Sequence, residues 1–266
     1  MTARVSVDDR ALRAVAVQFL INGAVVASYV PRLPEIRDDI GASLSTIGQI
    51  ITLATLGGLF GSLVAGRAVQ RFGTRATMLS GASGLIVLLP FVALAGTAWH
   101  LLVVLALIAA VDVVTDVSMN IQGSNISARR SVPVMNRLHG MWSVGTVAGG
   151  LGAAAMASLA VPLAWHLVGA SVVLATALVY VAPGLLTDDT PRTHDESGES
   201  QSVRTSGHVP RSLLVFGVLG AVAIVPEMVT SAGSAFRLRA DLGTREGVAG
   251  LGDVALTTGM LTGRLS

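Results

Sequence analysis

The residues with the greatest potential for chemistry are two aspartates inside a long apolar stretch. Asp112 and Asp116 lie four residues apart within residues 100–121, and Asn120 follows four residues later. In a helix this spacing puts the three side chains on one face. An aspartate near the bilayer centre costs about 2.5–3.5 kcal/mol, so this face must point to other helices or to a water-filled cavity. We therefore expect it to carry protons or bind a solute, or else to form a structural hydrogen bond between helices.

Polar side chains in other apolar stretches could share a pathway with these aspartates. His139, at the start of residues 138–160, could relay protons or bind a polar substrate, or could form an ordinary hydrogen bond at the headgroup level. Glu227 is a lone acid late in residues 212–230, where it would line the same cavity or lie near the outer interface. The candidate solute and proton pathway comprises Asp116, Asn120, Asp112, His139, Gln122, Asn22 and Glu227.

No motif of an enzyme, metal site or cofactor site accompanies these residues. The chain has no cysteine and its five histidines are scattered, so no ligand cluster is recognisable. It also lacks a Walker loop, a Rossmann fingerprint and a nucleophile elbow. A net charge of only +2, without a basic patch interleaved with aromatics, argues against nucleic-acid binding. We expect no cofactor and no enzymatic activity; an intramembrane enzyme would have only Asp116 and His139 in its favour.

The elements that must position these residues are transmembrane helices. The chain of 266 residues is 52% hydrophobic and only 13% charged, which is too apolar for a soluble domain of this length. Crossing about 30 Å of hydrocarbon takes about 20 helical residues. Because backbone groups in lipid must be paired internally and no period-two alternation is present, we expect an all-α integral membrane protein. The expected spans are residues 11–30, 45–66, 76–96, 100–121, 138–160, 163–184, 212–230 and 247–263.

The distribution of arginine predicts the orientation of these helices. All basic residues are arginine, and with a cytoplasmic N-terminus most of them fall in cytoplasmic segments, as the positive-inside rule requires. Trp99 and Trp165 then lie at outer span ends, where aromatic belts occur. We expect a multi-pass protein of the cell membrane. The arginines in outer segments are Arg32, Arg37, Arg237, Arg239 and Arg245.

A polar segment divides the chain. Residues 187–211 are charged and free of large apolar side chains, which is typical of a disordered cytoplasmic linker. It separates a six-helix bundle at residues 1–186 from an incomplete bundle of about two helices at residues 212–266. A weak internal repeat, Asp-Ile-Gly at residues 39–41 and Asp-Leu-Gly at residues 241–243, fits the layout of a duplicated transporter.

The turn between the second and third spans resembles a family signature. Residues 66–75 read Gly-Arg-Ala-Val-Gln-Arg-Phe-Gly-Thr-Arg, a glycine- and arginine-rich turn between two apolar spans. This turn resembles the signature loop of the major facilitator superfamily, although Gln70 replaces the usual acidic residue. In that family the acid helps to latch the cytoplasmic side. The matching positions are Gly66, Arg71, Gly73 and Arg75.

Three further segments resemble the bacterial branch of that superfamily related to fucose permeases. They are residues 32–37, 116–123 and 135–145. The resemblance implies that Asp116 and Asn120 take part in proton-coupled symport of a small polar, possibly sugar-like, solute by alternating access. The acid that the pattern has in helix one is absent, since the first span offers only the amides Gln18 and Asn22.

Small residues at four-residue intervals predict close helix packing in the second and fifth spans. They are Gly57 and Gly61 in the second span and Gly145 and Gly149 in the fifth. In the resembled fold these two helices form the seam against the second bundle, on helices eleven and eight. Static packing within one bundle would account for the same glycines.

The resemblance also sets an expectation for the length of the chain. The superfamily normally has twelve helices, whereas this sequence supplies about eight, so we expect a C-terminally truncated transporter. The alternative is a non-transporting remnant, or a membrane subunit that completes its bundle by self-association or with a partner. Lipid, a solute and a coupling proton are the other expected partners.

Overall fold

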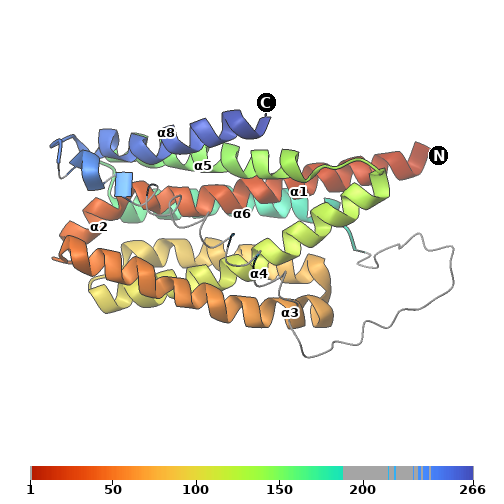
Figure 1. Cartoon of the computed structure of the whole chain (residues 1–266), viewed down its shortest axis with the longest axis horizontal. Helices are drawn as coiled ribbons and strands as arrows, with labels where there is room; N and C mark the ends of the chain where they lie inside the picture. Colours follow the sequence, from red (N-terminus) through yellow and green to blue (C-terminus); the bar gives the residue numbers. More distant parts are fainter. Residues whose placement is uncertain are drawn as a thin grey trace.

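The structure is a bundle of long helices. It is a computed structural model that describes residues 2–187, 215, 219, 230, 233–234, 236–239 and 241–265, and no strand occurs among these residues. The expectation of an all-α bundle is therefore confirmed. Its helices, which Figure 1 shows along their length, are α1 (Thr2–Tyr29), η1 (Val30–Arg32), α2 (Leu33–Asp39), α3 (Leu44–Ala93), α4 (Ala98–Arg130), α5 (Met135–Ser158), α6 (Leu163–Val181), η2 (Ala182–Gly184) and α8 (Glu246–Leu265).

The predicted spans correspond closely to these helices. Those between residues 11 and 184 lie within α1 to η2 with small differences at their ends, and the span predicted at 247–263 lies inside α8. Most of the span predicted at 212–230, nearly all of the linker at 187–211 and Glu227 lie outside the described residues.

α3 contains two predicted spans in one 50-residue segment. Gly73 interrupts it with φ 78° and ψ 162°, a conformation that is essentially restricted to glycine. The chain reverses there, so the two parts of α3 run antiparallel (Figure 1). The prediction of a ten-residue turn at 66–75 is wrong in extent, because residues 66–72 remain helical up to the break.

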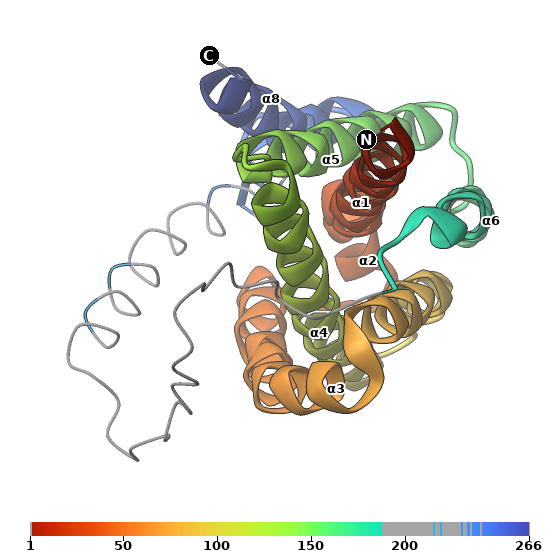
Figure 2. The ribbon, with the colours of Figure 1, turned by 90° about the vertical axis from the view of Figure 1, so that its right-hand side faces the viewer.

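Four helical segments are long and apolar enough to cross a membrane: Val7–Asp39, Leu44–Ala93, Ala98–Arg130 and Leu163–Gly184. At 50 residues, Leu44–Ala93 is long enough for two crossings. α8, which contains the span predicted at 247–263, is not in this set, and neither is α5. α5 is rich in glycine and alanine and packs on α1, which lies between α5, α6 and the α3–α4 pair (Figure 2).

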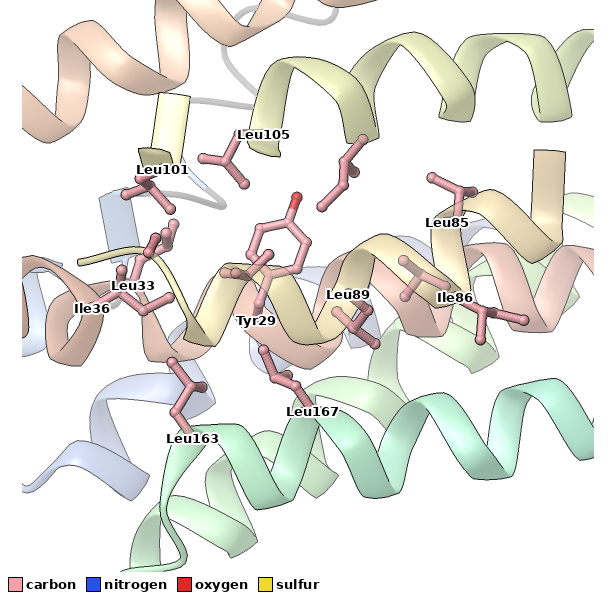
Figure 3. Close-up of a cluster of buried hydrophobic side chains, with 14 of the residues drawn as sticks. Tyr29, Leu33, Ile36, Leu85, Ile86, Leu89, Leu101, Leu105, Leu163 and Leu167 are labelled. Carbon is pink, nitrogen blue, oxygen red and sulfur yellow. The ribbon is translucent and has the colours of Figure 1, made fainter. Parts of the chain in front are cut away.

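The largest apolar core lies where α1 and α2 meet α3, α4 and α6. Figure 3 shows Tyr29, Leu33 and Ile36 surrounded by leucines of α3, α4 and α6, such as Leu89 and Leu101. Leu89 and Leu101 are fully buried. We call this end of the molecule the α2 end, and the opposite end, at the turn of α3, the Gly73 end.

Glycines bring α3 against α4. A β-carbon on Gly57 would meet the carbonyl oxygen of Ala106, and one on Gly61 would meet the carbonyl oxygen of Ala110. These two helices therefore touch at their backbones. The expectation that Gly57 and Gly61 line a seam with the second bundle is wrong, because their contacts lie on α4 within the first bundle.

The same correction applies to α5. A β-carbon on Gly145 would meet the carbonyl oxygen of Leu20, and one on Gly149 would lie 2.8 Å from that of Ala24. Both glycines thus pack α5 onto α1 rather than onto the second bundle. Static packing within the bundle, the alternative reading of these glycines, is what the structure shows.

A contact between α5 and α8 is nevertheless present. A β-carbon on Gly150 would lie 2.8 Å from Cγ2 of Val254, and one on Gly250 would lie 3.5 Å from Cβ of Ala154. Successive helical residues are turned by about 100°, so Gly150 faces away from the α1 side that Gly149 occupies. The fifth and eighth predicted spans therefore meet, through the neighbouring glycine.

The backbone contact at Gly57 leads to the first prediction. Gly57→Ala should lower the thermal stability of the purified protein by about 1–3 kcal/mol, because the added methyl group must push α3 and α4 apart. Gly48→Ala is the control on the same helix, since a β-carbon there meets nothing within 4 Å. Equal melting temperatures for the two variants would contradict the packing described.

Candidate functional site

The site is centred where α4 faces α1 and α5, which lie next to it in Figure 2. Oδ1 of Asp112 on α4 accepts a hydrogen bond of 2.8 Å from Nδ2 of Asn22 on α1. Oδ1 of Asn22 in turn accepts one of 3.2 Å from Nε1 of Trp142 on α5. We call these three residues the Trp142–Asn22–Asp112 chain; it joins three helices through the buried amide of Asn22 and its two partly exposed partners.

A glycine makes this arrangement possible. A β-carbon on Gly23 would meet the carbonyl oxygen of Trp142 and lie 2.8 Å from Oγ1 of Thr146. Because Gly23 has no side chain, α5 approaches α1 closely enough for the indole of Trp142 to reach the neighbouring Asn22. Asn22 is only 3% exposed, so its amide depends on these protein partners.

The second carboxylate has different partners. Nδ2 of Asn120 donates to Oδ1 of Asp116 at 3.0 Å and to the carbonyl oxygen of Asp116 at 2.9 Å. His139 on α5 lies near enough to Asp116 to interact with it electrostatically, and its ring packs edge-on against the ring of Phe19 at 5.3 Å between centroids. Asp116, Asn120 and His139 thus form a second polar centre beside the first.

These side chains share a half-buried face, as the four-residue spacing predicts. Asp112, Asp116, Asn120 and His139 all retain partial exposure. Partial exposure lets a carboxylate exchange protons or contact a solute, whereas its hydrogen bonds keep it in place. The arrangement can therefore hold a proton or a polar group between α1, α4 and α5.

Gln122, by contrast, is part of the structural core. Its Nε2 donates to Oγ1 of Thr74 at 3.0 Å and to the carbonyl oxygen of Leu186 at 3.1 Å, and its Oε1 accepts from the Leu186 amide at 3.3 Å. The side chain is fully buried. Its assignment to the solute pathway is corrected: it fastens α4 to α3 and to the segment after η2.

The signature-loop residues lie together at the Gly73 end. Nη2 of Arg75 donates to the carbonyl oxygen of Ala182 at 3.2 Å, which ties the turn to η2. The guanidinium of Arg71 lies 5.5 Å from the centroid of the Phe72 ring. A β-carbon on Gly66 would meet nothing within 4 Å, so the structure gives it no packing role.

At the α2 end lies a buried cation that was not among the predicted site residues. Arg32 is 4% exposed and donates to both carboxylate oxygens of Glu35 at 2.7 Å. It also donates to the carbonyl oxygen of Val161 at 2.9 Å and lies 3.4 Å from Nδ1 of His166. The three-residue spacing of Arg32 and Glu35 places them side by side on a helix, and it could have predicted their ion pair.

A buried amide on α1 was also absent from the predicted site residues. Gln18 is 1% exposed, and neither its Nε2 nor its Oε1 has a hydrogen-bond partner among the described residues. It lies one helical turn from Asn22 on the same face of α1. Trp142, too, had no predicted role, although it follows His139 by three residues on one helix.

Two contacts at the α2 end join the first bundle to the segment before α8. The guanidinium of Arg37 lies 5.7 Å from the centroid of the Phe236 ring, and Nη2 of Arg239 lies 3.8 Å from Oδ2 of Asp38. Phe236 is 6% exposed and belongs to the apolar core of that end. We call these four residues the α2-end contact.

The apolar hollow between α1, α5 and α6 is separate from the carboxylates. Its volume is about 400 Å³, and among its lining residues only Ser28, Trp165 and His166 carry polar atoms in their side chains. Across the described part of the chain, no group of three His, Cys, Asp or Glu side chains could hold a metal ion.

Comparisons with known proteins agree with this architecture. A family model described as Major Facilitator Superfamily matches residues 15–266. An uncharacterized transporter of Sinorhizobium fredii is 28% identical over 95% of this chain and 66% of its own length. The membrane protein MosC of Rhizobium meliloti is 28% identical over 96% of this chain and 60% of its own length.

A third relative matches a shorter region. An uncharacterized MFS-type transporter of Yersinia pestis is 27% identical over 52% of this chain and 36% of its own length. The chain thus spans less than two thirds of the relatives that it matches. No solved structure matches it.

The contacts of Gln122 lead to the second prediction. Gln122→Met should lower thermal stability by about 1–3 kcal/mol, because Thr74 and Leu186 lose buried hydrogen-bond partners. Any solute affinity should stay unchanged. Gln70→Met on the exposed surface is the control. Unchanged stability together with weaker solute binding would return Gln122 to the solute pathway.

Proposed function

This chain belongs to the Major Facilitator Superfamily, and from that premise we propose that it takes part in moving a small polar solute across the cell membrane by alternating access, coupled to protons. Its multi-pass helical architecture supports the proposal. No enzymatic role is proposed, since the site resembles a binding site rather than a catalytic one.

The observation that carries the proposal is the acidic face of α4. Asp112 and Asp116 are half-buried between α1, α4 and α5 and are held by partners on three helices. Ionisable side chains inside a membrane protein are costly and usually mark solute pathways or proton relays. In the proposed cycle Asp116 carries the coupling proton, with His139 beside it, and Asp112 responds through Asn22.

The sequence resemblance to the fucose-permease-related branch supports a sugar-like or similarly hydroxylated solute. The acid that the pattern has in helix one is absent, and Asn22 on α1 donates a hydrogen bond to Asp112. An amide and a carboxylate side by side can offer both donors and acceptors to hydroxyl groups. Gln18, with its unused amide one turn away, would add to that set.

We further propose a cytoplasmic N-terminus, which places the arginine-rich Gly73 end inside and the α2 end outside. Residues 1–186 would form one bundle and residues 212–266 part of a second, joined by a cytoplasmic linker. The α2-end contact would then close the outer side. The partly exposed ion pair of Arg239 and Asp38 contributes less than about 1 kcal/mol, so most of the cost of opening this closure would come from exposing the buried ring of Phe236.

The proton-carrying role of Asp116 leads to the third prediction. In proteoliposomes loaded with a pH-sensitive dye, Asp116→Asn should abolish the internal pH change that solute addition causes, because the amide cannot take up the proton. The solutes tested are a panel of neutral monosaccharides and polyols. Asp39→Asn, at an exposed position at the end of α2, is the matched control and should keep the response. A full response in Asp116→Asn would contradict proton coupling at this residue.

The wild-type protein itself could show no internal pH change on solute addition. That result would favour the alternative of a membrane subunit that does not transport by itself.

The α2-end contact leads to the fourth prediction. Because the chain has no cysteine, Asp38→Cys and Arg239→Cys can be combined without background thiols. A short bifunctional thiol reagent should cross-link this pair and stop transport, and reduction of a cleavable linker should restore it. The control pair is Asp38→Cys with Arg245→Cys, whose wild-type side chain is exposed. Cross-linking that leaves transport intact would contradict a closure that must open.

A further inference from the structure

The Trp142–Asn22–Asp112 chain has a fixed direction. The indole nitrogen of tryptophan can only donate, so the atom of Asn22 that faces Trp142 must be the amide oxygen. The amide nitrogen of Asn22 is then left to face Asp112, at 2.8 Å. The hydrogen bond from Trp142 therefore fixes the orientation of the Asn22 amide, so that its nitrogen faces Asp112.

This direction affects the proton affinity of Asp112. A donated hydrogen bond favours the charged form of a carboxyl group, whereas an acceptor facing it favours the protonated form. If Asn22 were free to turn over, its oxygen could accept a hydrogen bond from protonated Asp112. Without the indole N–H, no hydrogen bond among the described residues would hold the Asn22 oxygen toward α5, and a protonated Asp112 could draw it over.

We propose that Trp142 is a positioning residue that holds the Asn22 amide so that Asp112 gives up its proton more readily. The inference deepens the proposed function, on which it rests, by assigning the control of one carboxylate to a tryptophan on another helix. It also couples protonation to helix movement: separating α5 from α1 would break the bond of 3.2 Å, release the amide and let Asp112 keep a proton.

Other groups around Asp112 set the background for this effect. Tyr29 from α1 is buried, and its hydroxyl points toward α4 (Figure 3). Asp116 on α4 repels a charge on Asp112, and His139 from α5 lies near enough to attract Asp116. α3 also packs on α4, but its charged residues are at or near the Gly73 turn, at Arg67, Arg71 and Arg75.

The close approach of α1 and α5 makes the coupling specific. Gly23 lies against the carbonyl oxygen of Trp142, so a small separation of the two helices would move the indole away from Asn22. α5 also packs on α8 through Gly150 and Gly250. A movement of α8 against the first bundle would therefore reach Asp112 through Trp142 and Asn22.

The fifth prediction tests the direction of the shift. In purified protein in lipid nanodiscs, the infrared carbonyl band of protonated Asp112 is assigned by its loss in Asp112→Asn. In Trp142→Phe this band should persist to a pH higher by about one unit than in the wild type, because the freed amide can stabilise the protonated acid. Trp165→Phe, at an exposed position, should titrate as the wild type does.

A second variant separates the N–H group from the packing of the ring. Replacing Trp142 with 3-benzothienylalanine keeps the shape of the side chain but removes the donor, and it should give the same upward shift. A band that titrates at the wild-type pH in both variants would overturn the inference.

Fluorescence supplies an independent signal in a variant that keeps Trp142. Removing Trp99 and Trp165, which are 68% and 73% exposed, leaves Trp142 as the single tryptophan. Its emission should change with pH together with the Asp112 band, and Asp112→Asn should abolish that change. A pH-dependent emission that survives in Asp112→Asn would contradict the connection between the two residues.

Neither optical titration involves solute or transport. A normal infrared shift with no proton-coupled transport would overturn the proposed function and leave the role of Trp142 standing. Proton-coupled transport without any infrared shift would overturn only the role of Trp142.

Discussion

The structure depends on one constraint: polar groups that lie among apolar helices must find partners inside the protein. The backbone meets it by being helical over most of the described residues, with short connections between the helices. Apart from Gln18, the buried side-chain polar atoms of the described residues have such partners, as Arg32 has in Glu35 and Gln122 in Thr74 and Leu186, and the half-buried Asp112 pairs with Asn22. Asp112 combines such a bond with partial exposure, as Glu35 does in its pair with Arg32. Unlike Glu35, Asp112 is bonded to a neutral amide rather than to a cation, so this partner does not neutralise its charge.

Glycine supplies the geometry that satisfies the constraint. At Gly57 and Gly61 it lets α3 touch α4, and at Gly23 and Gly145 it lets α1 touch α5. The hydrogen bonds of the site are short enough to form only because these backbones are close. The hydrogen bonds of the site therefore depend on helix packing. A movement between the helices must change the hydrogen bonds around Asp112.

Patterns along one helix were predictable from the sequence, whereas partners between helices were not. The spans that fall within the described residues, the shared face of Asp112 and Asp116 and the pairing with Asn120 follow from local spacing, and the structure has them. The roles of Gln122 and of the four glycines were assigned wrongly, because spacing shows that a face is polar or small without showing what it meets. Trp142 was missed for the same reason: its partner lies 120 residues away in the chain.

The proposed function requires that the acidic face of α4 exchanges protons in the membrane. The most direct test is to count the protons that the purified protein in lipid nanodiscs takes up when the pH is lowered through the neutral range. The account predicts that Asp112→Asn with Asp116→Asn takes up fewer protons than the wild type over that range. Equal uptake by the two proteins would contradict it, because the face would then hold its charge without exchanging it.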